Sequence, residues 1–201
     1  MRFRLILIGL LFLPVCVLAQ AFRGGLFAGM SASQINGDEL SGYDLPGGQA
    51  GFFVFLPSGD RGAWQLELSF IQKGARELPS DTSIFYRARL NYVTIPLLYR
   101  YRLNQLSFEI GPALDINVYA QESDRNGDFE SNPPFNRFGL SGIFGVNYHF
   151  SEHFWVAFRT NNSILVIRPG TPLPGFGASP RLGGFGQRNL ILTFGLHYAF
   201  F

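Results

Sequence analysis

The end of the chain alternates between two kinds of side chain. The large apolar ones are Leu190, Leu192, Phe194, Leu196, Tyr198 and Phe200, and the mostly small or polar positions between them are Asn189, Ile191, Thr193, Gly195, His197 and Ala199. Because successive side chains of a strand point to opposite faces, residues 189–201 predict a strand with one apolar face. The segment ends in two aromatic residues, which suits a strand whose outer face meets lipid and whose end meets an aromatic girdle. This feature favours the last strand of an outer-membrane β-barrel.

The start of the chain has the pattern of a secretory signal peptide. Two arginines precede an apolar run over residues 5–18, which is shorter than the roughly 20 residues that a spanning helix needs. Residues 17–19 read Val-Leu-Ala, a plausible small-residue cleavage signal. We therefore expect residues 1–19 to be a signal peptide and residues 20–201 to form one barrel domain.

Cysteine and charge narrow the function classes. Cys16 is the one cysteine and lies in the expected leader, where Val15 is a poor fit to a lipidation signal. The 16 basic residues include Arg2 and Arg4 of that leader, so the remaining 14 balance the 14 acidic residues. A nucleic-acid partner would require a basic stripe. We expect no nucleic-acid partner and, in the processed chain, no disulfide.

Eight segments have the alternation or composition of strands. They cover residues 22–31, 48–56, 64–73, 90–101, 106–118, 138–150, 154–161 and 189–201. Several reach the roughly 9–11 residues that cross a bilayer at a tilt. Their connections alternate between long ones at residues 32–47, 74–89, 120–136 and 167–188 and short ones at residues 57–62, 102–105 and 151–153. This rhythm predicts long external loops, short periplasmic turns and both termini in the periplasm.

The predicted fold is all-β, an eight-stranded antiparallel up-and-down transmembrane β-barrel in the cell outer membrane. The less apolar face of the strands carries six charged residues, which are Glu67, Lys73, Arg100, Glu109, Asp115 and Arg159. Three acids and three bases can pair in a narrow lumen, so we expect a structural polar network there. A secreted soluble barrel, with the apolar face inside, stays open as an alternative. The loop rhythm and the terminal aromatics favour the membrane.

Two prolines test the register of neighbouring strands. Pro96 and Pro112 lie inside predicted strands and each removes a ladder donor. A turn over residues 102–105 brings both prolines to one local break, which we expect to be a shared bulge. The same register places Arg100 opposite Ser107.

Four stretches resemble a known family. Residues 67–74 (Glu-Leu-Ser-Phe-Ile-Gln-Lys-Gly), 90–99 (Leu-Asn-Tyr-Val-Thr-Ile-Pro-Leu-Leu-Tyr), 109–112 (Glu-Ile-Gly-Pro) and 195–200 (Gly-Leu-His-Tyr-Ala-Phe) resemble the third, fourth, fifth and closing strands of the PorT-like outer-membrane β-barrels of gram-negative bacteria. Thr193, Gly195, Tyr198 and Phe200 resemble the C-terminal signal by which the barrel-assembly machinery recognises its clients. Phe201 departs from that signal by adding a residue after the last aromatic.

The resemblance implies a location more than an activity. We expect an integral barrel without catalytic activity, cofactor or metal, acting as a structural or interaction scaffold with four long external loops. The alternative is a narrow pore, or a transport or secretion accessory, for a small or apolar ligand. An enzyme acting on membrane lipid is a third hypothesis. The expected partners are outer-membrane lipid and lipopolysaccharide, the barrel-assembly machinery during biogenesis, and an envelope protein as a further candidate.

Three local patterns of residues resemble chemical sites. Ser151, His149 and Glu152 resemble the nucleophile, the base and the orienting group of a lipid A deacylase, which needs them within hydrogen-bond reach. The loop rhythm puts them at the periplasmic side, away from the outer leaflet, so a turn is the favoured interpretation.

Residues 124–130 place side-chain oxygens at alternate positions, as a calcium-binding loop does, but Phe129 replaces the glycine that should follow the third ligand. Residues 169–180 lack the lysine of a phosphate-binding loop, and a partner-binding loop stays open.

Overall fold

The computed structural model describes residues 22–36, 42–76, 86–170 and 186–200 of the chain. Within these ranges the strands are β1 (Arg23–Asn36), β2 (Leu45–Ser58), β3 (Gly62–Arg76), β4 (Tyr86–Leu103), β5 (Leu106–Asp124), β6 (Gly127–Phe129), β7 (Phe138–His149), β8 (Phe154–Ser163), β9 (Arg168–Pro169) and β10 (Gly186–Ala199). No helix in this described part is both long and apolar enough to cross a membrane.

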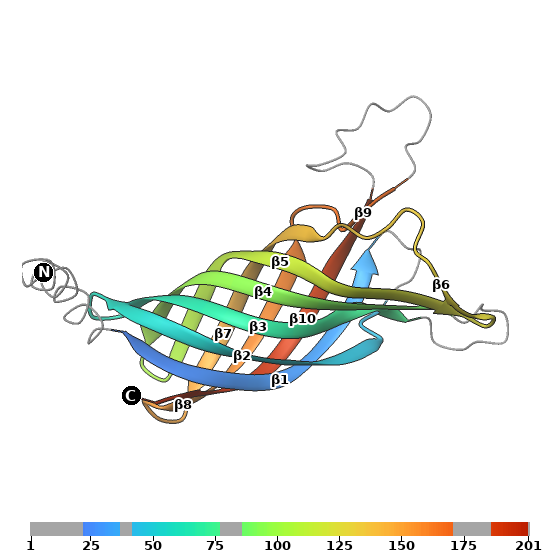
Figure 1. The fold of residues 1–201 in the computed structure, drawn as a ribbon. Helices are drawn as coiled ribbons and strands as arrows, with labels where there is room; N and C mark the ends of the chain where they lie inside the picture. Colours follow the sequence, from blue (N-terminus) through green and yellow to red (C-terminus); the bar gives the residue numbers. More distant parts are fainter. Residues whose placement is uncertain (1–21, 37–41, 77–85, 171–185, 201) are drawn as a thin grey trace, which may run out of the picture.

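Eight of the strands form a closed antiparallel barrel (Figure 1). Strands β1, β2, β3, β4, β5, β7, β8 and β10 pair in this order, and β10 pairs back onto β1 from Ala199 opposite Gly25 to Arg188 opposite Asn36. Closure leaves none of the eight strands as a free edge. The predicted eight-stranded barrel, and the role of the last strand in closing it, are confirmed. The short strands β6 and β9 are additions that pair with β5 and β10.

The two ends of the barrel differ. The β2–β3, β4–β5 and β7–β8 turns lie at one end, with the start of β1 and the end of β10, and we call this the short-turn end (Figure 1). The opposite end carries β6 and β9, and we call it the long-loop end. The β4–β5 turn contains only two residues between its strands, and Asn104 adopts the left-handed backbone conformation, with φ 56°. Tight hairpins favour this conformation, and asparagine tolerates it.

The apolar face of the barrel points outward. In β10, Phe194, Leu196 and Tyr198 are exposed, whereas Thr193 and His197 are buried. Exposed apolar side chains continue around the wall at Leu26, Met30, Phe52, Leu66, Leu68, Phe70, Leu97, Phe108, Ile110, Leu114, Phe144 and Phe158. A contiguous apolar surface of this extent marks a membrane contact. The soluble alternative, which needs this face inside the barrel, is therefore wrong.

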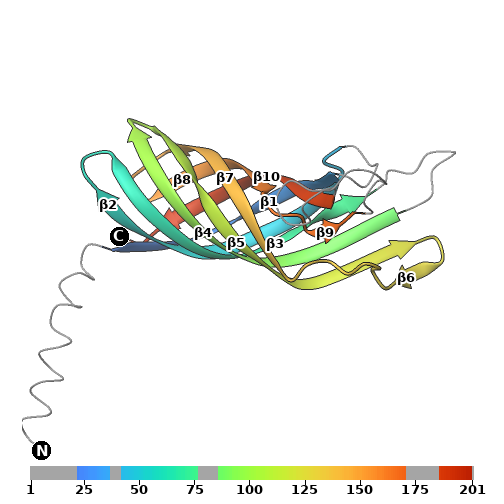
Figure 2. The ribbon, with the colours of Figure 1, turned by 90° about the horizontal axis from the view of Figure 1, so that it is seen from above.

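Strands β4 and β5 continue well past the predicted residues 90–101 and 106–118. Their added residues pair with one another up to Tyr86 opposite Asp124, and β5 then turns back into β6, which pairs with it beyond the barrel (Figures 1 and 2). The register shifts between Asn91 and Tyr92, opposite the unpaired Val118, which is a β-bulge. Outside the membrane a strand does not need an apolar face, so the sequence pattern fades there.

The predicted register between β4 and β5 is wrong. Arg100 lies opposite Glu109, and Ser107 lies opposite Arg102. The cause is the turn: only residues 104 and 105 separate the strands, whereas the prediction assigned residues 102–105 to it. A turn shorter by two residues slides the pairing by two and keeps every side chain on its predicted face.

The two strand prolines do not share a bulge, contrary to the prediction. The β3–β4 ladder skips Ile95 and Pro96, and the β4–β5 ladder skips Gly111 and Pro112. The register is unchanged across both gaps, so each proline interrupts one ladder locally. The backbones also approach closely here, since a Cβ on Gly111 would lie 2.0 Å from the carbonyl oxygen of Leu97.

Candidate functional site

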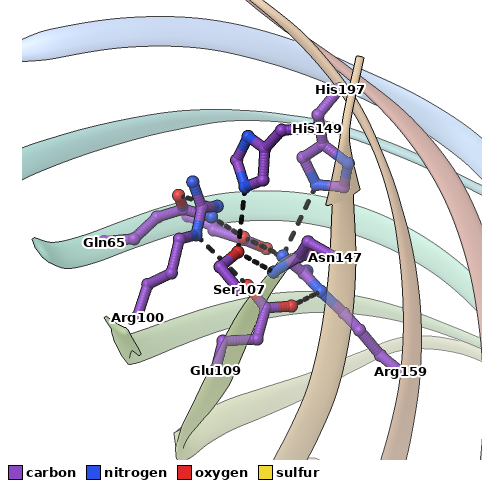
Figure 3. A network of polar contacts seen from close by, with 9 residues as sticks. Gln65, Arg100, Ser107, Glu109, Asn147, His149, Arg159 and His197 are labelled. Carbon is purple, nitrogen blue, oxygen red and sulfur yellow. Dashed lines mark hydrogen bonds and ion pairs between the residues drawn. The ribbon is translucent and has the colours of Figure 1, made fainter. Parts of the chain in front are cut away.

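A buried charge cluster lies at the centre of the barrel and consists of Glu67 on β3, Arg100 on β4, Glu109 on β5 and Arg159 on β8. Figure 3 shows the side chains of Arg100, Glu109 and Arg159. Arg159 donates from Nη1 and Nη2 to the two carboxylate oxygens of Glu67, at 2.9 and 2.7 Å. Its Nε also donates to Glu109. Bidentate hydrogen bonds between a guanidinium and a carboxylate are among the strongest in proteins. One arginine thus joins two acids that come from different strands.

Arg100 completes the central cluster. Its Nε lies 3.6 Å from Oε2 of Glu109, and its Nη2 donates to the side-chain oxygen of Gln65. Gln65 in turn donates to Glu67. The cluster therefore holds two acids and two bases, none of them more than 5% exposed. With two charges of each sign, the cluster is neutral as a unit. Buried charges are tolerated when they are paired and hydrogen-bonded.

A glycine makes room for the central contact. Gly145 on β7 lies opposite both Glu109 on β5 and Arg159 on β8. A Cβ on Gly145 would lie 2.7 Å from Oε1 of Glu109 and 2.8 Å from Cγ of Arg159. The missing side chain lets the acid and the base meet across the strand between them.

The remaining two of the six charges form a second buried pair nearer the long-loop end. Nζ of Lys73 donates to Oδ1 of Asp115 at 3.0 Å, and the hydroxyl of Thr94 donates to the same oxygen at 2.7 Å. The Lys73 ammonium also lies 4.7 Å from the ring centre of Tyr92. A cavity of about 20 Å³, lined by Glu67 and Thr94 among others, separates this pair from the central cluster. That volume holds about one water molecule.

An aromatic layer lies between the central cluster and the short-turn end. Its members are Phe27, Phe53, Phe55, His149, Trp155 and His197. The Trp155 side chain is 1% exposed, and its ring centre lies 5.3 Å from those of Phe53, His149 and His197. The Arg100 guanidinium lies 4.7 Å from the same ring, in cation–π contact.

The sequence pattern does not predict this layer, because it favours small and polar residues on the inner face. A signal was present, because Trp155 occupies an inward position between the outward Phe154 and Val156. Gly25 supports the layer from β1, since a Cβ there would lie 2.3 Å from the Phe53 ring. The short-turn mouth above Trp155 is a cavity of about 220 Å³.

The long-loop end is tied together by a further ion pair. Nη1 and Nη2 of Arg168 on β9 donate to the two oxygens of Glu122 on β5, at 2.8 and 3.0 Å. Nε of Arg168 donates to the carbonyl oxygen of Pro133, and the hydroxyl of Tyr86 donates to Glu122. Burial raises the pKa of Glu122, but the hydrogen bonds from Arg168 and Tyr86 outweigh it and hold that pKa below its usual value. The contacts anchor β9 over this end of the barrel.

The hydrolase-like residues are not assembled as a catalytic group. Nε2 of His149 lies 2.9 Å from the hydroxyl of Ser107, not Ser151. The Ser151 hydroxyl accepts backbone N–H groups within its own turn. Glu152 accepts from both Nη atoms of Arg102, at 3.0 and 3.1 Å, and these bonds hold its pKa below the usual value. The favoured interpretation of a short turn fits this geometry.

The other sequence candidates give no assembled site. Asp124 accepts the backbone N–H of Asn126 at 2.7 Å within the β5–β6 turn. Across residues 22–36, 42–76, 86–170 and 186–200, no group of three or more side chains is arranged to hold a metal ion. Most of the expected loop at residues 169–180 lies outside the described residues.

The four residues of the expected assembly signal divide between the two faces of β10 and its end. Thr193 and Gly195 face the lumen, and Tyr198 and Phe200 face outward at the short-turn end, 48% and 47% exposed. The backbone N–H of Phe200 donates to the carbonyl oxygen of Gly24 at 2.9 Å. The outward aromatic pair therefore lies where the barrel wall is closed by β1.

Comparisons with known proteins agree with this architecture. Neisserial surface protein A (NspA) has a similar structure, with a TM-score of 0.56 at 12% identity, covering 87% of this chain and 96% of NspA. Ail, the attachment invasion locus protein of Yersinia pestis, in complex with the heparin analogue sucrose octasulfate, gives a TM-score of 0.50 at 14% identity, covering 89% of this chain and 99% of Ail. No curated protein sequence matches the chain. At these identities the two structures show a shared fold.

The sequence itself identifies the family. Residues 18–165 match the family described as outer membrane protein beta-barrel domain, which is well over half of the 201 residues. The closed barrel, its outward apolar face and its paired interior are what such a protein needs in a bilayer. The chain therefore belongs to the outer membrane protein beta-barrel domain family and is an integral barrel of the outer membrane.

Proposed function

We propose that this protein is a closed, non-conducting scaffold that presents its long loops outside the cell. The observation that carries the proposal is the bond between Arg159 and Glu67. These residues lie on β8 and β3, which stand four places apart in the ring of eight strands and so face each other across the lumen. The Arg159–Glu67 ion pair therefore bridges opposite walls of the lumen, and we call it the crossbar. Arg100 and Glu109 fill the space beside it.

The filled interior also argues against transport. A pore for small ligands would need a path past Trp155 and then past the central cluster. The short-turn cavity of about 220 Å³ is lined by Trp155 and Arg100 among others, and a cavity lined by Glu67 and Arg159 among others holds only about 20 Å³. Opening a path would require breaking buried ion pairs, at a cost of several kcal/mol for each unpaired charge.

We infer that the long-loop end faces the outside and that both termini are periplasmic, because barrels of this class place short turns in the periplasm. The outward Tyr198 and Phe200 at the short-turn end support recognition by the barrel-assembly machinery. The hydrogen bond of His149 to Ser107, in place of Ser151, supports a protein without catalytic activity. The narrower assignment to PorT-like barrels rests on the four resembling stretches, of which three lie on neighbouring strands of the wall.

Cysteine labelling tests the orientation. Asn126 is exposed in the β5–β6 turn at the long-loop end, and Asp60 is exposed in the β2–β3 turn at the other end. We expect Asn126→Cys to react with a membrane-impermeant maleimide in intact cells, and Asp60→Cys to react only after permeabilisation. The unmutated protein controls for Cys16, which lies in the expected leader. The reverse pattern would show that the long loops face the periplasm.

A further inference from the structure

Three arginines gather on the outer face of the long-loop end. Arg76 on β3 lies directly opposite Arg87 on β4, and Arg89 follows two residues later on the same strand. The neighbouring Ala88 and Leu90 are buried in the lumen, so Arg87 and Arg89 point to the outer face. Arg89 is exposed, and the other two are half-buried.

Among the described residues, no acidic side chain forms an ion pair with these three arginines. The Nε atoms of Arg76 and Arg87 are buried without a hydrogen-bond partner. Like charges placed opposite each other on neighbouring strands destabilise a sheet. Burial lowers the pKa of Arg87, and the charges of Arg89 and Arg76 lower it further. An anion bound here would relieve both the repulsion and the unpaired donors.

The height of the cluster matches a lipid headgroup. The outward face of β4 is apolar from Leu103 to Val93, and then turns polar at Asn91 and Arg89. With a rise of about 3.4 Å per residue and a tilt of about 40°, Arg89 lies roughly 10 Å beyond the last apolar residue. The headgroup layer begins directly outside the hydrocarbon core, whose thickness is about 30 Å. The guanidinium groups therefore reach the level at which lipid phosphates lie.

We propose that Arg76, Arg87 and Arg89 bind a phosphate group of lipopolysaccharide in the outer leaflet. A guanidinium presents a planar fork of donors that matches phosphate oxygens, and arginine keeps its charge at a membrane surface. Three such groups on one outward patch can contact one phosphorylated sugar headgroup. The proposal rests on the proposed orientation, which puts this end of the barrel in the outer leaflet.

Binding of diphosphorylated lipid A to the purified barrel in neutral detergent tests this site. The variant is Arg87→Gln with Arg89→Gln, and the matched control is Arg23→Gln with Arg61→Gln, which removes two exposed arginines at the short-turn end. We expect the site variant to weaken binding at least tenfold and the control to bind as the unmutated protein does. Lipid A stripped of its phosphates should bind all three proteins equally weakly. Equal losses in both variants, or no loss in either, would overturn the site.

Two further measurements separate the remaining explanations. Inorganic phosphate at millimolar concentration should not compete with lipid A, and full competition would make this a site for free phosphate and overturn the lipid assignment. If the glutamine variant fails to show heat-modifiable migration, the Arg87→Lys and Arg89→Lys variant keeps the charge and should still bind several-fold more weakly, because lysine lacks the fork. Unchanged binding by that lysine variant would overturn the role of the fork. Labelling at Asn126→Cys reports the orientation independently of detergent binding, so failure of one is distinguishable from failure of the other.

Discussion

Replacing Arg159 by methionine is expected to lower the free energy of unfolding by about 3–5 kcal/mol, which is the usual loss when one partner of a buried ion pair is removed. Arg159 supplies hydrogen bonds to both Glu67 and Glu109, which would be left as buried acids with only Arg100 to balance them. The substitution keeps a long side chain, so most of the loss would come from charge. Methionine cannot donate to either carboxylate.

Denaturant unfolding in lipid vesicles measures this loss. The triple variant Arg159→Met, Glu67→Gln and Glu109→Gln leaves fewer buried charges and should recover part of the stability. Arg23→Met is the matched control, because Arg23 is exposed at the short-turn end and should change stability by less than about 0.5 kcal/mol. If Arg159→Met unfolds within about 1 kcal/mol of the unmutated protein, the central cluster does not hold the barrel together.

Replacing Trp155 by alanine is expected to cost about 3–5 kcal/mol, the range found for large aromatic residues truncated in a core. The Trp155 ring is almost fully buried and contacts Phe53, His149 and His197. Its removal would also take away the cation–π contact of Arg100 and deepen the short-turn cavity. The effect would thus combine a lost aromatic layer with a less supported charge cluster.

The same unfolding measurement checks this prediction. Trp155→Phe is the matched variant, because it keeps an aromatic ring at the site and should lose less than half as much stability. An alanine variant that unfolds at the denaturant concentration of the unmutated protein would mean that the aromatic layer contributes nothing to the barrel.

The sequence pattern predicts the faces of strands far better than their pairing. Alternation in residues 189–201 placed every second side chain of β10 on its observed face. The same parity put Glu67 and Arg159 on the inner face, yet it could not identify them as partners. They lie 92 residues apart in sequence, and their contact depends on the stagger and tilt of a closed barrel. Only closure brings β3 and β8 face to face.

The sequence pattern also does not predict the length of the β4–β5 turn or the space that the lumen offers. The two-residue β4–β5 turn shifted the register by two, which left Arg100 on the inner face but changed its neighbour from Ser107 to Glu109. Alternation sorts residues between two faces but does not say how much space the lumen offers at each level. The aromatic layer around Trp155 depends on that space, part of which is left by Gly25.

Single-channel recording in planar bilayers tests whether the buried ion pairs close the lumen. The inserted protein should first show heat-modifiable migration, so that a folded barrel is measured. The crossbar of Arg159 and Glu67 predicts no steady current from the unmutated protein across the usual range of voltages. A reproducible, steady single-channel conductance would contradict the scaffold and support a pore.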